Sequence, residues 1–154
     1  MGIKSYIGKR AKKVKGSSEN IKVSDYMSTN LVTFRPQQSV LEVMNTLIKK
    51  KISGGPVVNE NNELVGIISE GDCMKQISNS RYYNHPMEDI KVEQHMVTEV
   101  ETIDGNMNIF DAADKFLTSR RRRFPIVESG KLTGLISQKD ILKAALELKG
   151  QSWK

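Results

Sequence analysis

The apolar positions of residues 39–69 follow first a helical and then an extended period. Ser39, with Glu42 three positions later, forms a capping box of the kind that opens a helix. The apolar residues that we expect on the inner face of this helix are Val40, Val43, Met44, Leu47 and Ile48. The apolar runs Pro56–Asn59 and Leu64–Ser69 enclose a polar turn and predict a β-hairpin. A second helix is expected to begin near Glu70.

The same order of patterns returns 69 residues later. Ile21-Lys22-Val23 aligns with Ile90-Lys91-Val92, and after one residue is lost in the hairpin turn the offset becomes 68. Asn108 is the expected cap of the matching helix, and its inner face is expected to hold Ile109, Ala112, Ala113, Phe116 and Leu117. The last helix should begin near Gln138. Because so many positions match at one shift, the chain is an internal repeat.

Each copy is predicted to run strand, helix, strand, strand, helix, with the first strand of copy one at Leu31–Phe34. The predicted divisions are a basic tail or short helix at 1–20, repeat 1 at 21–80, a connector at 81–89 and repeat 2 at 90–149. A copy of about 60 residues buries too little surface to be stable alone. We therefore expect one α/β (α+β) body with pseudo-twofold symmetry, in which two small sheets pack together and helices flank them.

The stretch GIISEGD in copy one returns as GLISQKD in copy two. The pairs with the shared Ser-x-x-Asp spacing are Ser69 with Asp72 and Ser137 with Asp140. As a capping box, each pair would stabilise a helix start by about 1 kcal/mol. Each pair also follows an apolar strand, where α/β proteins bind ligands and helix N–H groups attract anions. An aspartate there can accept from ribose hydroxyls, and Gly66 would let other backbone approach closely. The spacing is consistent both with a helix cap and with a nucleotide-binding site at the junction of strand and helix.

The net charge of +6 is concentrated at the N-terminus. Residues 1–20 hold six lysines and arginines against Glu19, so this tail carries +5 and the rest of the chain +1. The tail is either a solvated terminus or an amphipathic anchor for nucleic acid or anionic lipid. No apolar run is long enough for a membrane span or a signal peptide, and a single cysteine excludes an intrachain disulfide. We therefore expect a cytoplasmic protein.

Candidate catalytic chemistry is sparse. Cys73 occupies an apolar helix position and is expected in the core. His85 and His95 have no metal-ligand spacing with it. His85 lies in the connector, where a ligand lid and a plain loop are both open interpretations. Because no nucleophile with a base and no acid–base pair is visible, we expect no enzyme activity, no metal and no catalytic cofactor.

In this order, the motifs resemble a pair of CBS domains, named after cystathionine β-synthase and often called a Bateman module. The stretches that carry the resemblance are IKVSDYMSTNLVTFRP, ISGGPVV and GIISEGD in copy one, and IKVEQHMVTEVETID, RRFPIV and GLISQKD in copy two. The resemblance covers residues 20–149. It implies a stand-alone regulatory protein, often a homodimer, whose inter-repeat clefts bind AMP, ADP, ATP or S-adenosylmethionine. Ligand would change the conformation that an unidentified partner protein reads.

The resemblance also implies which residues contact ligand. Asp72 and Asp140 would hold ribose hydroxyls, with Ser69 and Ser137 beside them. The residues that would flank the base are Met27, Thr29, Ile52, Gly54, Pro56, Met96, Thr98, Phe124 and Pro125.

Phosphate contacts are implied two and three residues before the proline. Copy two has Arg122 and Arg123 at these positions, within the run Arg120–Arg123, whereas copy one has Ser53 and Gly54. A solvated face or a nucleic-acid patch is the other interpretation of the arginines. If they bind phosphate, the two sites are unequal.

Three functions compete at this point. The first is a sensor of adenosyl nucleotides. The second is a dimeric interaction module with empty clefts, in which the Ser–Asp pairs are only helix caps. The third is a weak nucleic-acid binder that uses the tail and Arg120–Arg123, which would bind with a steep salt dependence.

Overall fold

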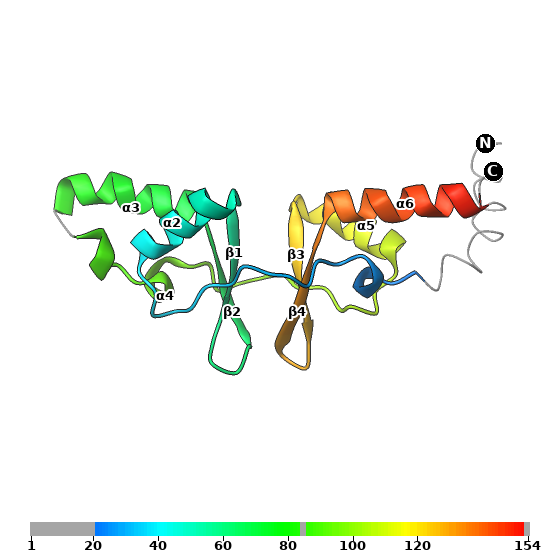
Figure 1. The fold of residues 1–154 in the computed structure, drawn as a ribbon, viewed down its shortest axis with the longest axis horizontal. Coiled ribbons are helices and arrows are strands. Elements are labelled where there is room, and N and C mark those ends of the chain that lie inside the picture. Colours follow the sequence, from blue (N-terminus) through cyan, green and yellow to red (C-terminus); the bar gives the residue numbers. More distant parts are fainter. Residues whose placement is uncertain (1–20, 84–85, 153–154) are drawn as a thin grey trace. The chain divides into compact units, whose positions relative to one another are not determined.

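The computed structural model describes residues 21–83 and 86–152, so the predictions for the tail and for His85 lie outside the described residues. In chain order the elements are η1 (Val23–Asp25), α2 (Val40–Lys50), β1 (Gly54–Val58), β2 (Leu64–Ser69), α3 (Glu70–Tyr83), η2 (Met87–Asp89), α4 (Val92–His95), α5 (Ile109–Ser119), β3 (Arg123–Glu128), β4 (Lys131–Ser137) and α6 (Gln138–Ser152). Figure 1 shows each hairpin with a pair of helices beside it. The expected α/β (α+β) fold with two small sheets flanked by helices is confirmed.

Each sheet is a two-stranded hairpin, β1 with β2 and β3 with β4. An extended segment adds one bridge to the first strand of each hairpin: Phe34 pairs in parallel with Val57, and Ile103 with Ile126. The predicted strand at Leu31–Phe34 is therefore reduced to this bridge, in which the amide of Phe34 donates to the carbonyl of Pro56 at 2.9 Å. Pro36 follows two residues later and lacks the N–H that a longer ladder would need.

The caps of the two 11-residue helices, α2 and α5, form as the sequence predicts. The Ser39 side chain accepts a hydrogen bond from the amide of Glu42 at 3.1 Å and opens α2. Asn108 Oδ1 accepts from the amide of Phe110 at 2.7 Å and opens α5. Because each cap satisfies an N–H that the helix itself leaves free, the start of each helix is determined locally.

The expected inner faces of these helices were wrong at one position each. Ile48 is 77 % exposed and Leu117 is 78 % exposed. The buried stripes are Val40, Val43 and Leu47 in α2, and Ile109, Ala112 and Phe116 in α5. Ile48 and Leu117 each follow the last stripe residue directly, which turns them about 100° around the helix and away from the core.

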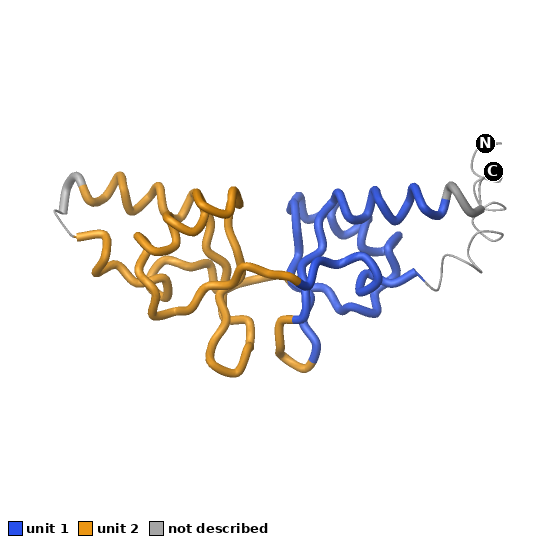
Figure 2. The backbone as a smooth tube through the Cα atoms, viewed as in Figure 1, with its two compact units in different colours: residues 1–29, 102–128, 133–154 blue, residues 30–101, 129–132 orange. Residues whose placement is uncertain are grey.

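The described chain divides into two compact units that exchange segments between the repeats (Figure 2). Of the described residues, unit 1 contains 21–29, 102–128 and 133–152, and unit 2 contains 30–83, 86–101 and 129–132. The segment 21–29 at the start of repeat 1 is thus part of the unit with α5 and α6. The segment 90–101 completes the unit with α2 and α3.

Each unit has its own apolar core. In unit 2, Phe34, Val57 and Ile68 from the sheet pack against the buried stripe of α2. In unit 1, Phe116 and Phe124 have ring centroids 4.8 Å apart with planes tilted by 56°, a favourable aromatic geometry. These cores hold the ends of β2 and β4 in place, and the repeated motif lies at those ends.

Candidate functional site

The repeated Ser–Asp pair of unit 1 joins the end of β4 to the start of α6. Asp140 Oδ2 accepts two hydrogen bonds from Ser137, one from the amide at 2.8 Å and one from the hydroxyl at 2.9 Å. The amide of Asp140 donates back to Ser137 Oγ at 3.2 Å. The pair is therefore a reciprocal helix cap, and its carboxylate lies at the positive end of the helix dipole.

Unit 2 repeats this arrangement between β2 and α3. Each junction of strand and helix, with its Ser–Asp pair, is called a corner below. Asp72 Oδ2 accepts from the amide of Ser69 at 2.9 Å and from its hydroxyl at 3.0 Å. In both corners the Oδ1 atom of the aspartate makes no hydrogen bond to a residue that the structure describes. Each half-buried carboxylate thus has one oxygen committed to the helix start and one with two lone pairs available.

The exchanged segments bring a methionine onto the glycine of each motif. A Cβ atom on Gly66 would lie 2.6 Å from the Sδ atom of Met96, and a Cβ atom on Gly134 would lie 2.5 Å from that of Met27. The neighbouring backbone pairs directly with the strand: the amide of Ile67 donates to the carbonyl of Val97 at 2.9 Å. The expectation that Gly66 permits a close backbone approach is confirmed.

In unit 1, the amide of Leu135 makes the matching bond to the carbonyl of Ser28 at 3.0 Å, and the amide of Ser28 donates back to the carbonyl of Leu135 at 2.8 Å. Met27 and the exposed Thr29 consequently lie beside the strand that ends at Ser137, although they belong to the other repeat in sequence. Met96 and the exposed Thr98 lie beside the strand that ends at Ser69.

The loop before each hairpin contacts the start of the long helix that follows it. The amide of Gln138 donates to the carbonyl of Arg122 at 3.3 Å, and its side chain donates to the carbonyl of Arg121 at 3.1 Å. Arg122 and Arg123 are exposed and belong to the corner that holds Asp140. In unit 2 the amide of Glu70 donates to the carbonyl of Ser53 at 2.9 Å.

The two corners therefore have the same backbone arrangement and different charges. Gly54 pairs with Ser69, and a Cβ atom on Gly54 would lie 2.8 Å from the carbonyl oxygen of Ile68. The structure brings Gly54 and the half-buried Ile52 to the corner of Asp72, with no arginine in the run Lys51–Gly54.

Three residues expected beside the base are buried in their units. Phe124 is 0 % exposed and its ring packs against Phe116 in the core. Pro125 and Pro56 are buried within β3 and β1. In this conformation their side chains support the strands, and a ligand would approach the more exposed neighbouring residues.

Cys73 follows Asp72 on α3 and is buried, as expected. Burial, and then the charges of Asp72 and Glu70, raise the pKa of its thiol. A raised pKa favours the thiol over the nucleophilic thiolate. Among residues 21–83 and 86–152, no group of three His, Cys, Asp or Glu side chains is arranged to hold a metal ion. Within the same residues, no helix has the length and hydropathy that a membrane span requires.

Sequence comparison identifies the class of protein to which this arrangement belongs. The model of the CBS domain matches residues 23–79 and again residues 88–147. The chain therefore belongs to the CBS domain family and contains a tandem pair of these domains.

Two curated relatives and one solved structure illustrate this membership. An uncharacterized 17.7 kDa protein of Acidianus ambivalens is 30 % identical over 128 residues, which cover 82 % of this chain and 74 % of that protein. The uncharacterized protein MJ1225 of Methanocaldococcus jannaschii is 26 % identical over 134 residues, and the match covers 87 % of this chain but only 45 % of the relative. The crystal structure of CBSX2 of Arabidopsis thaliana in complex with AMP superimposes with a TM-score of 0.71 at 29 % identity, covering 83 % of this chain and 98 % of that chain.

Sequence reasoning missed two features near the site. The contact of Met27 with Gly134 joins residues 107 positions apart, and no local pattern indicates it. The bond between Gln76 and His95 was also missed. One signal for it existed: Gln76 stands at a helix position where the second copy has Ala144.

Proposed function

We propose that the protein is a regulatory module that binds an adenosyl nucleotide at one or both Ser–Asp corners and is not itself an enzyme. The observation that carries this proposal is that Oδ1 of Asp72 and of Asp140 can each accept further hydrogen bonds. Each oxygen lies at a helix start, near a strand glycine that the methionine of an exchanged segment contacts. Ribose hydroxyls are donors that suit such an oxygen, and the helix start attracts phosphate. The AMP complex of a relative that shares the fold at 29 % identity supports this choice of ligand.

The proposed contacts follow the placement of each residue. Ser69 and Ser137 position the carboxylates, and the segments at Met27–Thr29 and Met96–Thr98 flank the base. Ile52, Gly54 and Pro56 contribute to the corner of unit 2, and Phe124 and Pro125 support the corner of unit 1. Arg122 and Arg123 contact phosphate.

The arginines favour different ligands at the two corners. Arg122 and Arg123 add two exposed positive charges at the corner of Asp140, whereas Ser53 and Gly54 occupy the matching positions near Asp72. Phosphate oxygens bind guanidinium groups through charge-assisted, often bidentate hydrogen bonds. We therefore expect ADP or ATP at unit 1 and a ligand with less charge, such as AMP or S-adenosylmethionine, at unit 2.

The regulated form is proposed to be a homodimer formed through the helices. The exposed apolar side chains on the helices are Leu41, Ile48, Met74, Ile77, Phe110, Leu117, Leu142 and Leu146. They recur on α2 and α3 and on α5 and α6, and large exposed apolar areas are typical of interaction surfaces. A second copy presents the same surface, which permits a self-complementary interface. Ligand would then shift the dimer between conformations that a partner protein distinguishes.

Calorimetric and thermal-shift titrations with AMP, ADP, ATP and S-adenosylmethionine test the proposed ligands. We expect saturable heat and a rise in Tm with at least one of them, because a ligand that binds only the folded state stabilises it. Asp72→Ala and Asp140→Ala should each abolish binding at their own corner. Ser39→Ala is the matched control, since it removes a helix cap far along the chain from either motif and should lower Tm without changing affinity.

Three outcomes would contradict the proposed function or its site. If no nucleotide binds and both aspartate variants lose only stability, the pairs are helix caps in an interaction module. If Asp72→Ala and Asp140→Ala leave nucleotide affinity unchanged, the ligand lies elsewhere. If instead a DNA or RNA oligonucleotide binds with a steep salt dependence that deletion of residues 1–20 removes, the basic tail is the functional element.

A further inference from the structure

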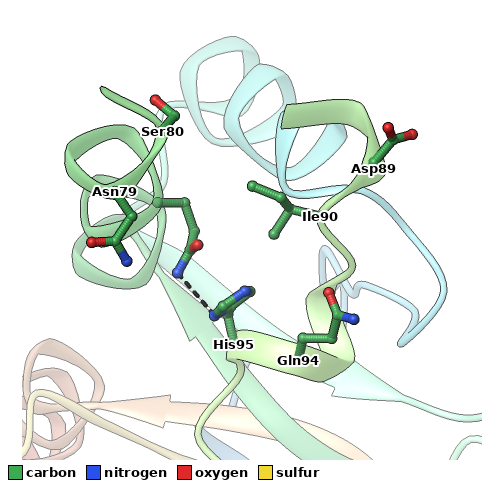
Figure 3. A pocket seen from close by; sticks show the side chains of 7 residues that line it. Asn79, Ser80, Asp89, Ile90, Gln94 and His95 are labelled. Atoms are coloured by element: carbon green, nitrogen blue, oxygen red, sulfur yellow. Dashed lines mark hydrogen bonds between the residues drawn. The ribbon is translucent and has the colours of Figure 1, made fainter. Parts of the chain in front are cut away.

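A pocket of about 440 Å³ lies within unit 2, on α3 and on the segment that contains η2 and α4. It is lined by Gln76, Asn79, Ser80, Asp89, Ile90, Gln94 and His95. In Figure 3 the imidazole of His95 lies at the floor, with Asn79 and Ser80 on one side and Asp89, Ile90 and Gln94 on the other. Its volume is in the range of small-molecule sites. It contains neither the Ser–Asp pair nor the glycine of the repeated motif.

Gln76 is the most informative residue of this pocket. It is 6 % exposed, and its Nε2 atom lies 2.8 Å from Nδ1 of His95 (dashed line in Figure 3). With the amide as donor, Nδ1 accepts and the imidazole proton is on Nε2. No hydrogen bond to the Oε1 atom of Gln76 comes from any residue in the described part of the chain. This oxygen is not sealed from solvent, so it can accept a hydrogen bond from water or from a ligand in the pocket.

The corresponding place in unit 1 is apolar and filled. Ala144 and Leu148 take the positions of Gln76 and Ser80, and Tyr26 takes the position of His95. The cluster that fills this place is Ile109, Ala144 and Leu148, with Ile21, Tyr26 and Ile141 packed against it. The fold can therefore close this space with apolar side chains, which stabilises it. In unit 2 the described residues at this place are mostly polar, and they line a pocket instead.

The bonds already present determine what the pocket offers a ligand. Ser80 Oγ donates its proton to the carbonyl of Ile77 at 2.8 Å, so only its lone pairs remain. Gln76 Oε1 and the carboxylate of Asp89 are also acceptors. The side-chain amides of Asn79 and Gln94 can present either their N–H donors or their carbonyl acceptor.

The charges of the lining residues limit the chemical class of the ligand further. Among the described residues that line the pocket there is no lysine or arginine, and Asp89 is the only carboxylate. The N–H at Nε2 of His95 is a donor, but the acceptors of the described lining residues outnumber it. A ligand that suits this lining supplies several N–H donors and a positive charge, and phosphate and carboxylate groups suit it less. We propose that this pocket binds a small organic cation through an ammonium or guanidinium group.

The proposal does not depend on nucleotide binding, and two probes of equal shape test it. N-acetyl-L-argininamide carries a guanidinium group, and N-acetyl-L-citrullinamide carries a neutral urea in its place. The full chain labelled with ¹⁵N is titrated with each. We expect saturable shifts of the backbone and side-chain amides of Gln76, Asn79 and Gln94 with the argininamide, and no saturable shift with the citrullinamide or with inorganic phosphate.

Variants connect the binding to these residues. Asp89→Asn should weaken argininamide binding by about tenfold, the loss expected for one charge-assisted hydrogen bond. The double variant Gln76→Ala with Ser80→Leu copies the residues of unit 1, so it should fold and should no longer bind. Asp72→Ala, at the nucleotide corner, should bind the argininamide like the unchanged protein.

The proposal is overturned if the argininamide produces no saturable shift, if both probes or phosphate bind equally well, or if folded Asp89→Asn and the double variant retain full affinity. Loss of nucleotide binding alone does not affect these measurements. The two proposals can therefore fail separately.

Discussion

The hydroxyl of Tyr26 donates a hydrogen bond to the carboxylate of Glu147, 121 residues away on α6. This bond ties the segment 21–29, at the start of repeat 1, to the last helix of unit 1. The hydrogen bond, then burial, and then the nearby charges of Glu147 and Asp25 raise the pKa of Tyr26 from 10.0 to about 12. The bond therefore depends on a protonated phenol.

Tyr26→Phe should lower the free energy of unfolding at pH 7 by about 1 kcal/mol, the typical net value of one hydrogen bond. Because the folded pKa is raised, the contribution of the phenol is fully present below pH 10 and is lost as the pH rises from 10 to 12. Urea denaturation of both proteins at pH 7 and across that window measures the difference. A difference that stays constant from pH 7 to pH 12 would contradict the assigned bond.

Gly66→Ala should destabilise unit 2 by about 1–3 kcal/mol, the usual cost of overpacking a filled site. The added Cβ would lie 2.6 Å from Met96 Sδ and 2.9 Å from the carbonyl oxygen of Val97, and the backbone atom cannot rotate away. Gly71→Ala is the matched control, since the nearest atom to its Cβ is 3.8 Å away. Because alanine also favours a helix, Gly71→Ala should leave Tm unchanged or raise it. Equal Tm values for the two variants would contradict the close approach of segment 90–101.

Arg122→Ala and Arg123→Ala should weaken ATP binding and leave adenosine binding unchanged, because the guanidinium groups are proposed to contact only phosphate. A loss of about tenfold for each arginine is expected at low salt, and it should shrink as salt screens the charges. Lys51→Ala, at the position in copy one that corresponds to Arg120, is the control and should change neither affinity. Calorimetry at two salt concentrations measures these changes. Equal losses for adenosine and ATP would show that the arginines support the fold.

Ile48→Glu and Leu117→Glu should convert the proposed homodimer to a monomer without unfolding it. Both side chains are more than three-quarters exposed within the chain, so a charge there costs little in the monomer and much in an apolar interface. Light scattering after gel filtration gives the mass, and circular dichroism confirms folding.

Lys50→Glu is the control for this surface, since its side chain points about 200° away from Ile48 on the same helix. It should leave the mass of the assembly unchanged. If Ile48→Glu and Leu117→Glu also leave the mass unchanged, the exposed side chains serve another contact.

The features that the sequence determined by itself are those that neighbouring residues create. The hairpins, the caps at Ser39 and Asn108, and the Ser–Asp pairs all depend on hydrogen bonds or periodicity within a few positions. The shift of 69 residues between the two copies can likewise be found in the sequence alone. It leads to the CBS family and to the α/β fold. The exposure of Ile48 and of Leu117 was not predicted, because a helical stripe one residue wider fits the same apolar positions.

Only the tertiary structure decided which distant residues meet. Met27 lies on Gly134 and Met96 on Gly66 because each glycine leaves the space of one side chain at the surface of its strand. The two copies are too similar in sequence to indicate that segments 21–29 and 90–101 are exchanged between units. The pocket on Gln76 and His95 likewise depends on a bond across 19 residues and on a space that unit 1 fills with Leu148. Such contacts depend on steric fit between segments far apart in the chain, and the local sequence pattern does not predict that fit.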